Sequence, residues 1–168
     1  MITGKYEVSD NQHHLVVTRE LPAPVADVWA AITDSPLLGR WLLTWTGDPA
    51  SGRVDARLEF EEGTPTEGYA IEVCEAPRHL RVRAGDADAP HVWVIDVQLR
   101  AQDGGTTLVL TQPLTRLEDA CDLGPGWEYY LDRLAESLAT AEVSTIAWPG
   151  RYPALAGEYA SAFGLSHM

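Results

Sequence analysis

Residues 122–142 read Asp122-Leu-Gly-Pro-Gly-Trp-Glu-Tyr-Tyr-Leu-Asp-Arg-Leu-Ala-Glu-Ser-Leu-Ala-Thr-Ala-Glu142, and this pattern predicts one long amphipathic helix. The apolar side chains recur every three or four residues, which collects them on one face of a 3.6-residue repeat. They are Trp127, Tyr130, Leu131, Leu134, Leu138 and Ala141. The acids Glu128, Asp132, Glu136 and Glu142 are expected on the opposite, solvent-facing side. The Gly124-Pro125-Gly126 cluster is expected to break the chain just before the helix.

Upstream of this segment, the hydrophobic period changes from that of a helix to that of a strand. Alternating apolar and polar side chains predict about seven strands. Their ranges are 14–21, 42–47, 54–61, 67–75, 79–84, 91–101 and 106–113. Two short helices are expected after the first strand, at 25–33 and 35–41, and residues 1–12 are expected to be loose. Because short turns join antiparallel neighbours, we predict a single α+β domain over residues 1–168, with a curved antiparallel sheet around the long helix.

The composition excludes several classes of partner. Twelve basic against 25 acidic residues give a net charge of −13, which repels nucleic acid and anionic membrane surfaces. No apolar segment of 18 residues is present, so membrane insertion is not expected. Cys74 and Cys121 have no metal-binding spacing and suit a reducing compartment. We therefore expect a cytoplasmic protein.

The last residues, 143–168, carry more apolar side chains than a free tail would. They include Trp148, Tyr152, Leu155, Tyr159 and Phe163. A short closing helix is expected here, packed on the sheet or on a second subunit. An exposed aromatic tail would also suit a protein partner or a homodimer.

Three stretches carry a resemblance to a known family. They are Val17-Thr-Arg-Glu-Leu-Pro-Ala-Pro-Val-Ala-Asp-Val-Trp-Ala-Ala-Ile-Thr-Asp34, Leu38-Gly-Arg-Trp-Leu42 and Gly126-Trp-Glu-Tyr-Tyr-Leu-Asp-Arg-Leu134. With the predicted order of elements, they resemble the heat-shock-protein-90 ATPase activator homologue-like family, within the START and polyketide-cyclase group of helix-grip proteins. The resemblance covers about residues 14–142 and leaves the aromatic tail outside. It implies a helix-grip fold with an elongated apolar cavity between the sheet and the final helix, where small apolar or amphipathic molecules bind.

Side chains from the long helix, the helical elbow and the strands are expected to line such a cavity. They are Trp41, Trp45, Leu58, Tyr69, Trp93, Ile95, Trp127, Tyr130, Leu131 and Leu134. Tryptophan and tyrosine suit a pocket that must hold an apolar ligand in one orientation, since each combines a large apolar ring with one polar atom. The alternative is that the same side chains fill a solid core.

The sequence contains no pattern that identifies a catalytic, metal or cofactor site. His13 and His14 are adjacent and would point to opposite faces of a strand, and His79 and His91 lie on different predicted strands. There is no Gly-x-Ser-x-Gly nucleophile motif and no glycine-rich phosphate loop. The acids closest to predicted strand or cavity-rim positions are Asp34, Glu59, Glu72 and Asp96. Glu59 and Glu72 are expected to point outward, whereas the direction of Asp96 stays open, and Arg81 and Arg83 are expected to pair with surface acids.

Three functions remain for such a chain. The first is non-catalytic binding of a small apolar or amphipathic molecule. The second is a polyketide cyclase or aromatase-like lyase that uses a cavity carboxylate or a tyrosine hydroxyl, so the sequence leaves open whether the protein is an enzyme. The third is a protein-interaction module, either chaperone-effector-like or a homodimer through the tail, in which case deletion after Glu142 would leave the fold intact.

Overall fold

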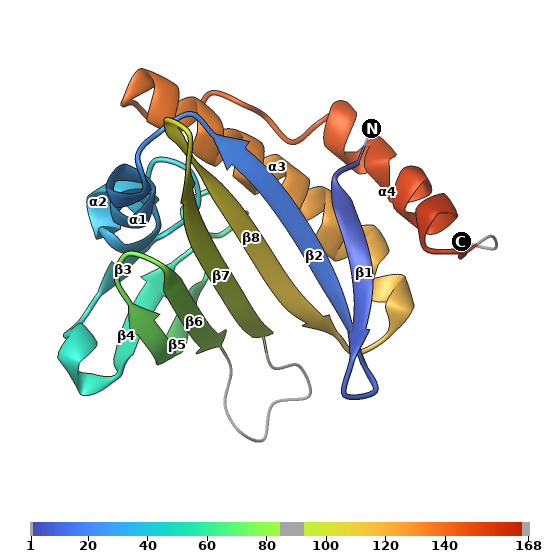
Figure 1. Ribbon diagram of the computed structural model, residues 1–168, viewed down its shortest axis with the longest axis horizontal. Coiled ribbons are helices and arrows are strands. Elements are labelled where there is room, and N and C mark those ends of the chain that lie inside the picture. The colour runs from blue at the N-terminus through green and yellow to red at the C-terminus, as the bar shows by residue number, and fades with distance from the viewer. Residues whose placement is uncertain (1, 85–92, 166–168) are drawn as a thin grey trace.

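The computed structural model describes residues 2–84 and 93–165, and these form an eight-stranded antiparallel sheet with four α-helices (Figure 1). The strands are β1 (Gly4–Ser9), β2 (Gln12–Leu21), β3 (Thr44–Thr46), β4 (Arg53–Arg57), β5 (Thr66–Glu75), β6 (His79–Ala84), β7 (Trp93–Gln102) and β8 (Gly105–Leu114). The helices are α1 (Val25–Thr33), α2 (Ser35–Leu38), α3 (Ala120–Thr140) and α4 (Arg151–Ala162), with short 3-10 turns η1 (Pro49–Ser51) and η2 (Leu117–Asp119). The strand order is β1-β2-β8-β7-β6-β5-β4-β3.

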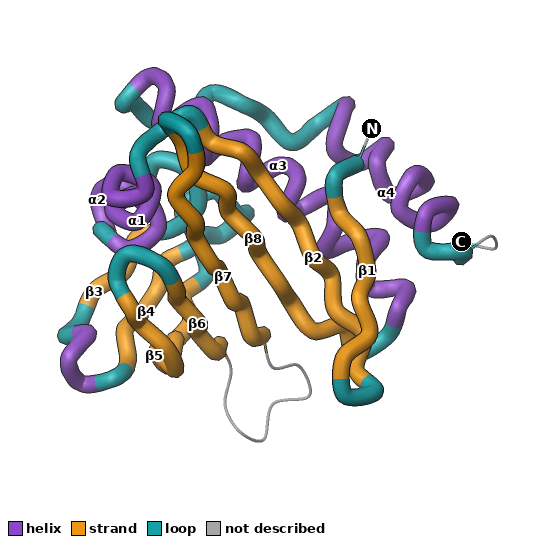
Figure 2. Tube along the Cα trace, in the orientation of Figure 1, coloured by secondary structure: helices purple, strands orange, loops and turns teal. Residues whose placement is uncertain are grey.

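The helices cover one face of this single sheet layer (Figure 2). The long helix α3 runs behind the strands, α1 and α2 lie at one end of it, and α4 lies beyond β1. This arrangement confirms the predicted α+β class and the curved antiparallel sheet around one long helix. No helix within the described ranges is both long and apolar enough to cross a bilayer.

The N-terminus differs from the prediction, because residues 4–9 form a strand instead of a loose segment. β1 pairs with β2 through a tight hairpin at Asp10 and Asn11. Both have positive φ angles, 51° and 62°, which two-residue hairpin turns require and which Asp and Asn tolerate. The Asp-Asn pair was therefore the signal that the prediction of a loose N-terminus missed.

Other predicted elements differ at their ends. The strand predicted at 54–61 ends at Arg57, and the chain then turns through Gly63 and Thr64, both at positive φ. The strand predicted at 91–101 is observed from Trp93, and its first residues lie outside the described ranges, as does the turn predicted at 86–90.

The helix α3 starts earlier than predicted, at Ala120, and contains Gly124-Pro125-Gly126. The prediction of a break at these residues is wrong, and packing explains why. A Cβ at Gly124 would lie 2.4 Å from the ring of Tyr159, so the glycine makes room for α4. Pro125 is the sixth residue of the helix, beyond its first turn, so its missing N–H removes one intrahelical hydrogen bond.

The C-terminal tail folds back on its own chain instead of remaining exposed. Its helix α4 packs on α3. Four of its large apolar side chains are buried, namely Tyr152, Leu155, Tyr159 and Phe163. The Tyr159 ring is held between α3 and β1, since a Cβ at Gly4 would also collide with it. The predicted closing helix is thus confirmed, whereas the alternative of an exposed aromatic tail is wrong for these four residues. Among the large apolar side chains of the described tail, residues 143–165, Trp148 and Val143 stay substantially exposed.

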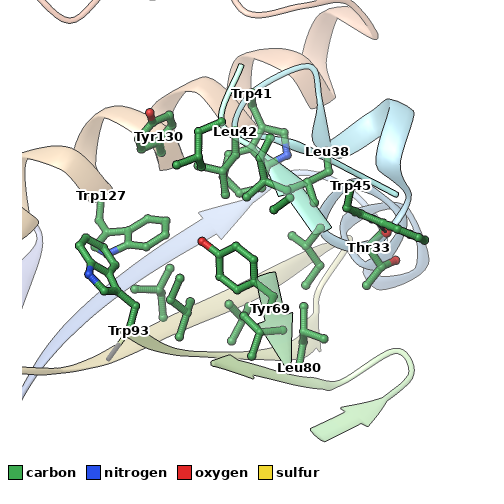
Figure 3. Close-up of a pocket in the computed structure, with 18 of the residues that line it drawn as sticks. Thr33, Leu38, Trp41, Leu42, Trp45, Tyr69, Leu80, Trp93, Trp127 and Tyr130 are labelled. Carbon is green, nitrogen blue, oxygen red and sulfur yellow. Dashed lines mark hydrogen bonds between the residues drawn. The ribbon is translucent and has the colours of Figure 1, made fainter. Parts of the chain in front are cut away.

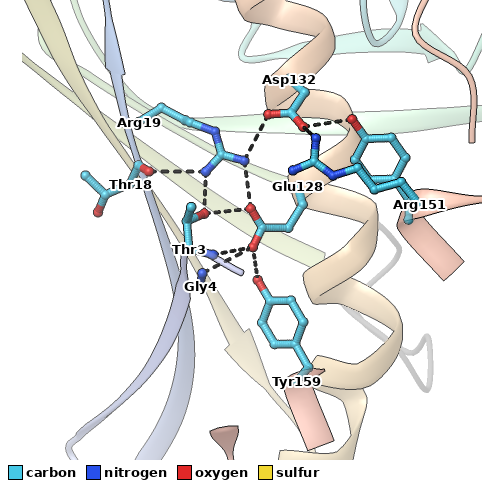
Figure 4. Close-up of polar contacts among 9 residues, drawn as sticks. Thr3, Gly4, Thr18, Arg19, Glu128, Asp132, Arg151 and Tyr159 are labelled. Carbon is cyan, nitrogen blue, oxygen red and sulfur yellow. Dashed lines mark hydrogen bonds and ion pairs between the residues drawn. The ribbon is translucent and has the colours of Figure 1, made fainter. Parts of the chain in front are cut away.

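The placement of Glu128 on a solvent-facing side of the helix is also wrong, since its side chain is only 2% exposed. One carboxylate oxygen accepts hydrogen bonds from the Thr3 backbone N–H and the Tyr159 hydroxyl, each at 2.7 Å, and the other accepts one from Arg19 Nη2 at 2.7 Å (Figure 4). Burial by itself raises the pKa of Glu128, but the hydrogen bonds from Thr3, Tyr159 and Arg19 outweigh it and lower this pKa below 4.5. One buried carboxylate therefore joins β1, β2, α3 and α4.

Candidate functional site

A cavity of about 630 Å³ lies between the inner face of the sheet and α3 (Figure 3). Its volume falls in the range of small-molecule sites, roughly 300–1,000 Å³. Strands β3 to β8 form its floor, α3 covers it, and α1, α2 and the following loop close one end. Within the described residues, β1, β2 and α4 contribute no lining side chain, so the buried Glu128 cluster and the cavity are separate features.

Strand alternation explains which side chains of the sheet reach the cavity. On β4 they are Val54 and Ala56, and on β6 they are Leu80 and Val82, two residues apart in each case. On β5 the alternation is interrupted by a register shift between Ile71 and Val73. Cys74 lines the cavity beyond this bulge, whereas Val73 does not.

Nine of the ten side chains expected to line a cavity do so. They are Trp41, Trp45, Leu58, Tyr69, Trp93, Ile95, Trp127, Tyr130 and Leu131. The tenth, Leu134, lies one turn further along α3 and is fully buried in the core, away from the cavity wall. Aliphatic side chains that the sequence did not single out also line the cavity, such as Ile32, Ala56 and Val82. Alternation along β4 and β6 could have identified the last two.

Three tryptophan rings of the cavity wall are held in place by their own N–H groups. Trp41 Nε1 donates to the carbonyl oxygen of Ala31 at 3.0 Å, and Trp45 Nε1 donates to that of Thr33 at 2.9 Å. Trp127 Nε1 donates to Gln112 Oε1 at 2.7 Å. The rings therefore present apolar faces to the cavity while their polar atoms bind the protein. Trp127 therefore connects α3 to β8 through this hydrogen bond and also lines the cavity.

Two tyrosines and two glutamates give the cavity a polar end. The Tyr69 hydroxyl donates to Glu67 Oε2 at 3.4 Å, and the Tyr130 hydroxyl interacts with the carboxylate of Glu61. Burial raises the pKa of both tyrosines, and the nearby carboxylates raise it further. Both hydroxyls are thus protonated at neutral pH. The glutamates themselves are exposed, which places them at the mouth of the cavity.

None of the four acids that the sequence placed near cavity-rim or strand positions lines the cavity. Asp34 caps α2, and Glu59 accepts a hydrogen bond from Thr44 Oγ1 at 2.8 Å. Glu72 pairs with Arg83 at 3.0 Å on the sheet surface, as expected. The acids that do line the cavity are Glu61, Glu67 and Asp122. Glu67 shares one face of its strand with Tyr69 and Ile71, so strand alternation could have predicted that it points toward the cavity. Glu61 lies in an irregular loop, where alternation predicts no direction.

Asp96, whose direction the sequence left open, lies on the outer face of the sheet. Its Oδ2 is 2.7 Å from His79 Nε2 and 3.1 Å from Arg81 Nε. Arg81 was predicted to pair with a surface acid, but its partner Asp96 is buried, and the contact with His79 was not predicted. Among residues 2–84 and 93–165, no three His, Cys, Asp or Glu side chains gather closely enough to hold a metal ion, and His91 lies outside these ranges.

A curved antiparallel sheet closed on a long C-terminal helix, with an apolar cavity between them, defines the helix-grip class of α+β proteins. The chain belongs to the family of activator of Hsp90 ATPase homolog 1-like proteins, which matches residues 22–139. The resemblance found in the sequence is thereby confirmed. The matched range leaves out β1, β2 and α4.

Solved structures share this architecture over most of the chain. The crystal structure of CalU16 from Micromonospora echinospora superimposes with a TM-score of 0.71 at 22% identity and covers 98% of both chains. A conserved protein of unknown function from Enterococcus faecalis, EF2215, gives a TM-score of 0.68 at 17% identity, over 98% of this chain and 92% of its own. DynU16, encoded in the dynemicin biosynthetic locus, gives 0.68 at 23% identity, over 78% of this chain but 49% of its own. Comparison with curated proteins gives no match.

Proposed function

We propose that the protein binds a small apolar or amphipathic molecule in the cavity between the sheet and α3 and carries or senses it without transforming it. The observation that supports this function is the cavity itself, about 630 Å³ in volume and walled mainly by aliphatic and aromatic side chains. Protein cores normally pack to the density of organic crystals, and unfilled apolar space costs stability. A space of this size is therefore best explained by an occupant. The two free cysteines support placing this function in the cytoplasm.

Filling the cavity from its floor is expected to weaken ligand binding. Ile71 lines the cavity on β5, so Ile71→Trp would place an indole where the ligand lies, and we expect affinity to fall by about tenfold or more. Four tryptophans line the wall, so their fluorescence measures the binding of apolar probes such as aliphatic alcohols, steroids and aromatic polyketides. The same titration on both proteins gives the ratio of dissociation constants.

A matched control lies two residues away on the same strand. Val73 pairs with Arg81, whose side chain reaches Asp96 on the outer face of the sheet, so Val73→Trp adds the same ring outside the cavity. It is expected to leave affinity unchanged. Equal binding by wild type and Ile71→Trp would argue against the cavity as the site.

One observation favours a second function, a cyclase or aromatase-like lyase. The Tyr69 hydroxyl lines the cavity beside Glu67 and is directed toward the α3 side (Figure 3). Its raised pKa keeps it protonated, so it is suited to donate a hydrogen bond to a substrate oxygen, in exchange for its bond to Glu67, rather than to act as a base.

If the protein is such a lyase, Tyr69→Phe is expected to lower turnover of a poly-β-ketone substrate by about 100-fold or more, the range found when one hydrogen-bond donor to a developing oxyanion is removed. Its affinity for an apolar alcohol should stay unchanged. Tyr6→Phe, on the exposed part of β1, is the control and should retain full turnover. Absence of turnover by the wild-type protein, with binding intact, would leave only the carrier function.

A further inference from the structure

Almost all of the polar side-chain atoms of the cavity wall that are free to bind a ligand are hydrogen-bond acceptors. The N–H groups of Trp41, Trp45 and Trp127 already donate to protein oxygens, and the hydroxyl of Tyr69 donates to Glu67. The Tyr130 hydroxyl interacts with the carboxylate of Glu61. A ligand that brings only acceptor atoms would therefore have to displace one of these bonds.

The charge of the cavity wall also favours a ligand that donates hydrogen bonds. Its charged residues are Glu61, Glu67 and Asp122, and no Lys, Arg or His lines it within the described ranges. The carboxylates of Glu61 and Glu67 both act on Tyr69, so the two acids lie at the same end of the cavity. An anion placed there would meet carboxylates without a compensating cation.

The buried cation on α3, Arg133, is held by bonds to the protein itself, although its charge reaches the Tyr130 hydroxyl and lowers the pKa of that group. The Arg133 guanidinium donates from Nε to the Trp41 carbonyl oxygen at 3.1 Å and from Nη1 to that of Ile146 at 2.6 Å. Its carbon atom Cζ lies 4.0 Å from the centre of the Phe60 ring. These contacts hold it behind the wall, and it is not a lining residue.

The aromatic rings of the cavity wall add a third contribution. Trp93 is 40% exposed and lines the cavity, and the Trp127 and Tyr130 rings lie with their centres 6.3 Å apart. The faces of such rings attract cations and repel anions. The overall charge of −13 also raises the local concentration of cations over that of anions.

We propose that the cavity selects apolar amines, with the apolar body between the sheet and α3 and the ammonium group at the mouth against Glu61 and Glu67, and that it disfavours carboxylates of the same shape. This inference rests on the proposed binding function and names its ligand class. It separates two groups of amphipathic molecules, hydrophobic amines and fatty-acid-like anions, which an apolar cavity alone would not distinguish.

The test compares three probes of one shape with the full-length protein at pH 7, namely 4-butylbenzylamine, 4-butylbenzyl alcohol and 4-butylbenzoate. Isothermal titration calorimetry measures each dissociation constant. We expect the amine to bind at least about tenfold more tightly than the benzoate, with the affinity of the alcohol between them. The reason is that two exposed carboxylates at the mouth attract the ammonium group and repel the benzoate. Added salt should weaken amine binding and leave alcohol binding unchanged.

A charge-matched pair of variants separates the rim carboxylates from the net charge. The double variant Glu61→Gln/Glu67→Gln removes two charges at the mouth, and Glu59→Gln/Glu72→Gln removes two on the outside of the molecule. Only the first is expected to reduce the preference for the amine over the benzoate, to about twofold or less. Alcohol affinity should be the same in both.

The outcomes that overturn the proposal are distinct. If the alcohol binds and the benzoate binds as tightly as the amine, the amine preference is wrong and the binding function stands. If the outer double variant loses the preference as fully as the rim variant, the rim carboxylates do not select the ligand. If none of the three probes binds, both the preference and the cavity function fail.

Discussion

Deletion of residues 143–168 is expected to destabilise the whole protein, and not merely to remove an interaction surface. The segment buries Tyr152, Leu155, Tyr159 and Phe163 against the rest of the chain. Four such side chains contribute about 6–12 kcal/mol at about 1.5–3 kcal/mol each. The ordering entropy of the helix offsets part of this. We expect a net loss of about 3–5 kcal/mol, which is a large share of a typical stability of about 5–15 kcal/mol.

Thermal unfolding followed by circular dichroism measures this loss, and the melting temperature should fall by about 10 °C or more. The point variant Tyr159→Ala asks the same question without shortening the chain and is expected to cost about 3–5 kcal/mol, since its ring is fully buried. Ser161→Ala, on the exposed side of α4, is the matched control and should change stability by less than about 0.5 kcal/mol. A truncated chain that melted at the wild-type temperature would restore the view of the tail as a detachable surface.

Replacement of Glu128 is expected to have the second large effect. Glu128→Ala leaves the buried Tyr159 hydroxyl without its acceptor and removes one of the two carboxylates that pair with Arg19, the other being Asp132. Breaking a buried ion pair by removing one partner typically costs about 3–5 kcal/mol. Urea denaturation should show this loss as a lower midpoint. Glu142→Ala, at an exposed position just beyond the same helix, should be close to neutral.

The acid dependence of stability provides an independent test of the same carboxylate. The pKa of Glu128 is lower in the folded protein than the ordinary value of 4.5 that applies when it is unfolded. The charged carboxylate therefore stabilises the fold fully above pH 4.5, and this contribution is lost as the pH falls through the folded-state pKa. Glu128→Gln cannot titrate, so its stability should fall less steeply with acid below pH 4.5. Parallel acid-unfolding curves for the two proteins would contradict the assignment.

The burial of Glu128 also shows why a helical pattern could not assign every face of α3. On the sequence, Glu128 and Asp132 alternate with the apolar stripe as surface acids do. Their partners include Arg19, 109 residues from Glu128, and Tyr159, on a helix whose docking the pattern could not specify. A carboxylate is stable in the interior only with such partners, and a one-dimensional pattern does not contain them.

The cavity presents the opposite case, since most of its lining was predictable. Side chains that alternate along a strand or recur along a helix share one face whatever the fold, which is why nine of the ten expected residues meet there. Leu134 follows the same repeat but lies past the point where the cavity ends. The periodicity identifies a face of a helix, but it does not say how far along that face a cavity extends.

Local patterns were thus enough to predict the α+β class, the long helix, the antiparallel sheet around it and the apolar set that faces inward, because periodicity depends only on neighbours in the chain. Three other features required the folded chain: the docking of Tyr159 between Gly4 and Gly124, the burial of Glu128, and the open space under α3 with Glu61 at its mouth. Each depends on segments far apart in sequence that meet at particular distances. The space between packed elements is a property of their assembly and not of any one segment.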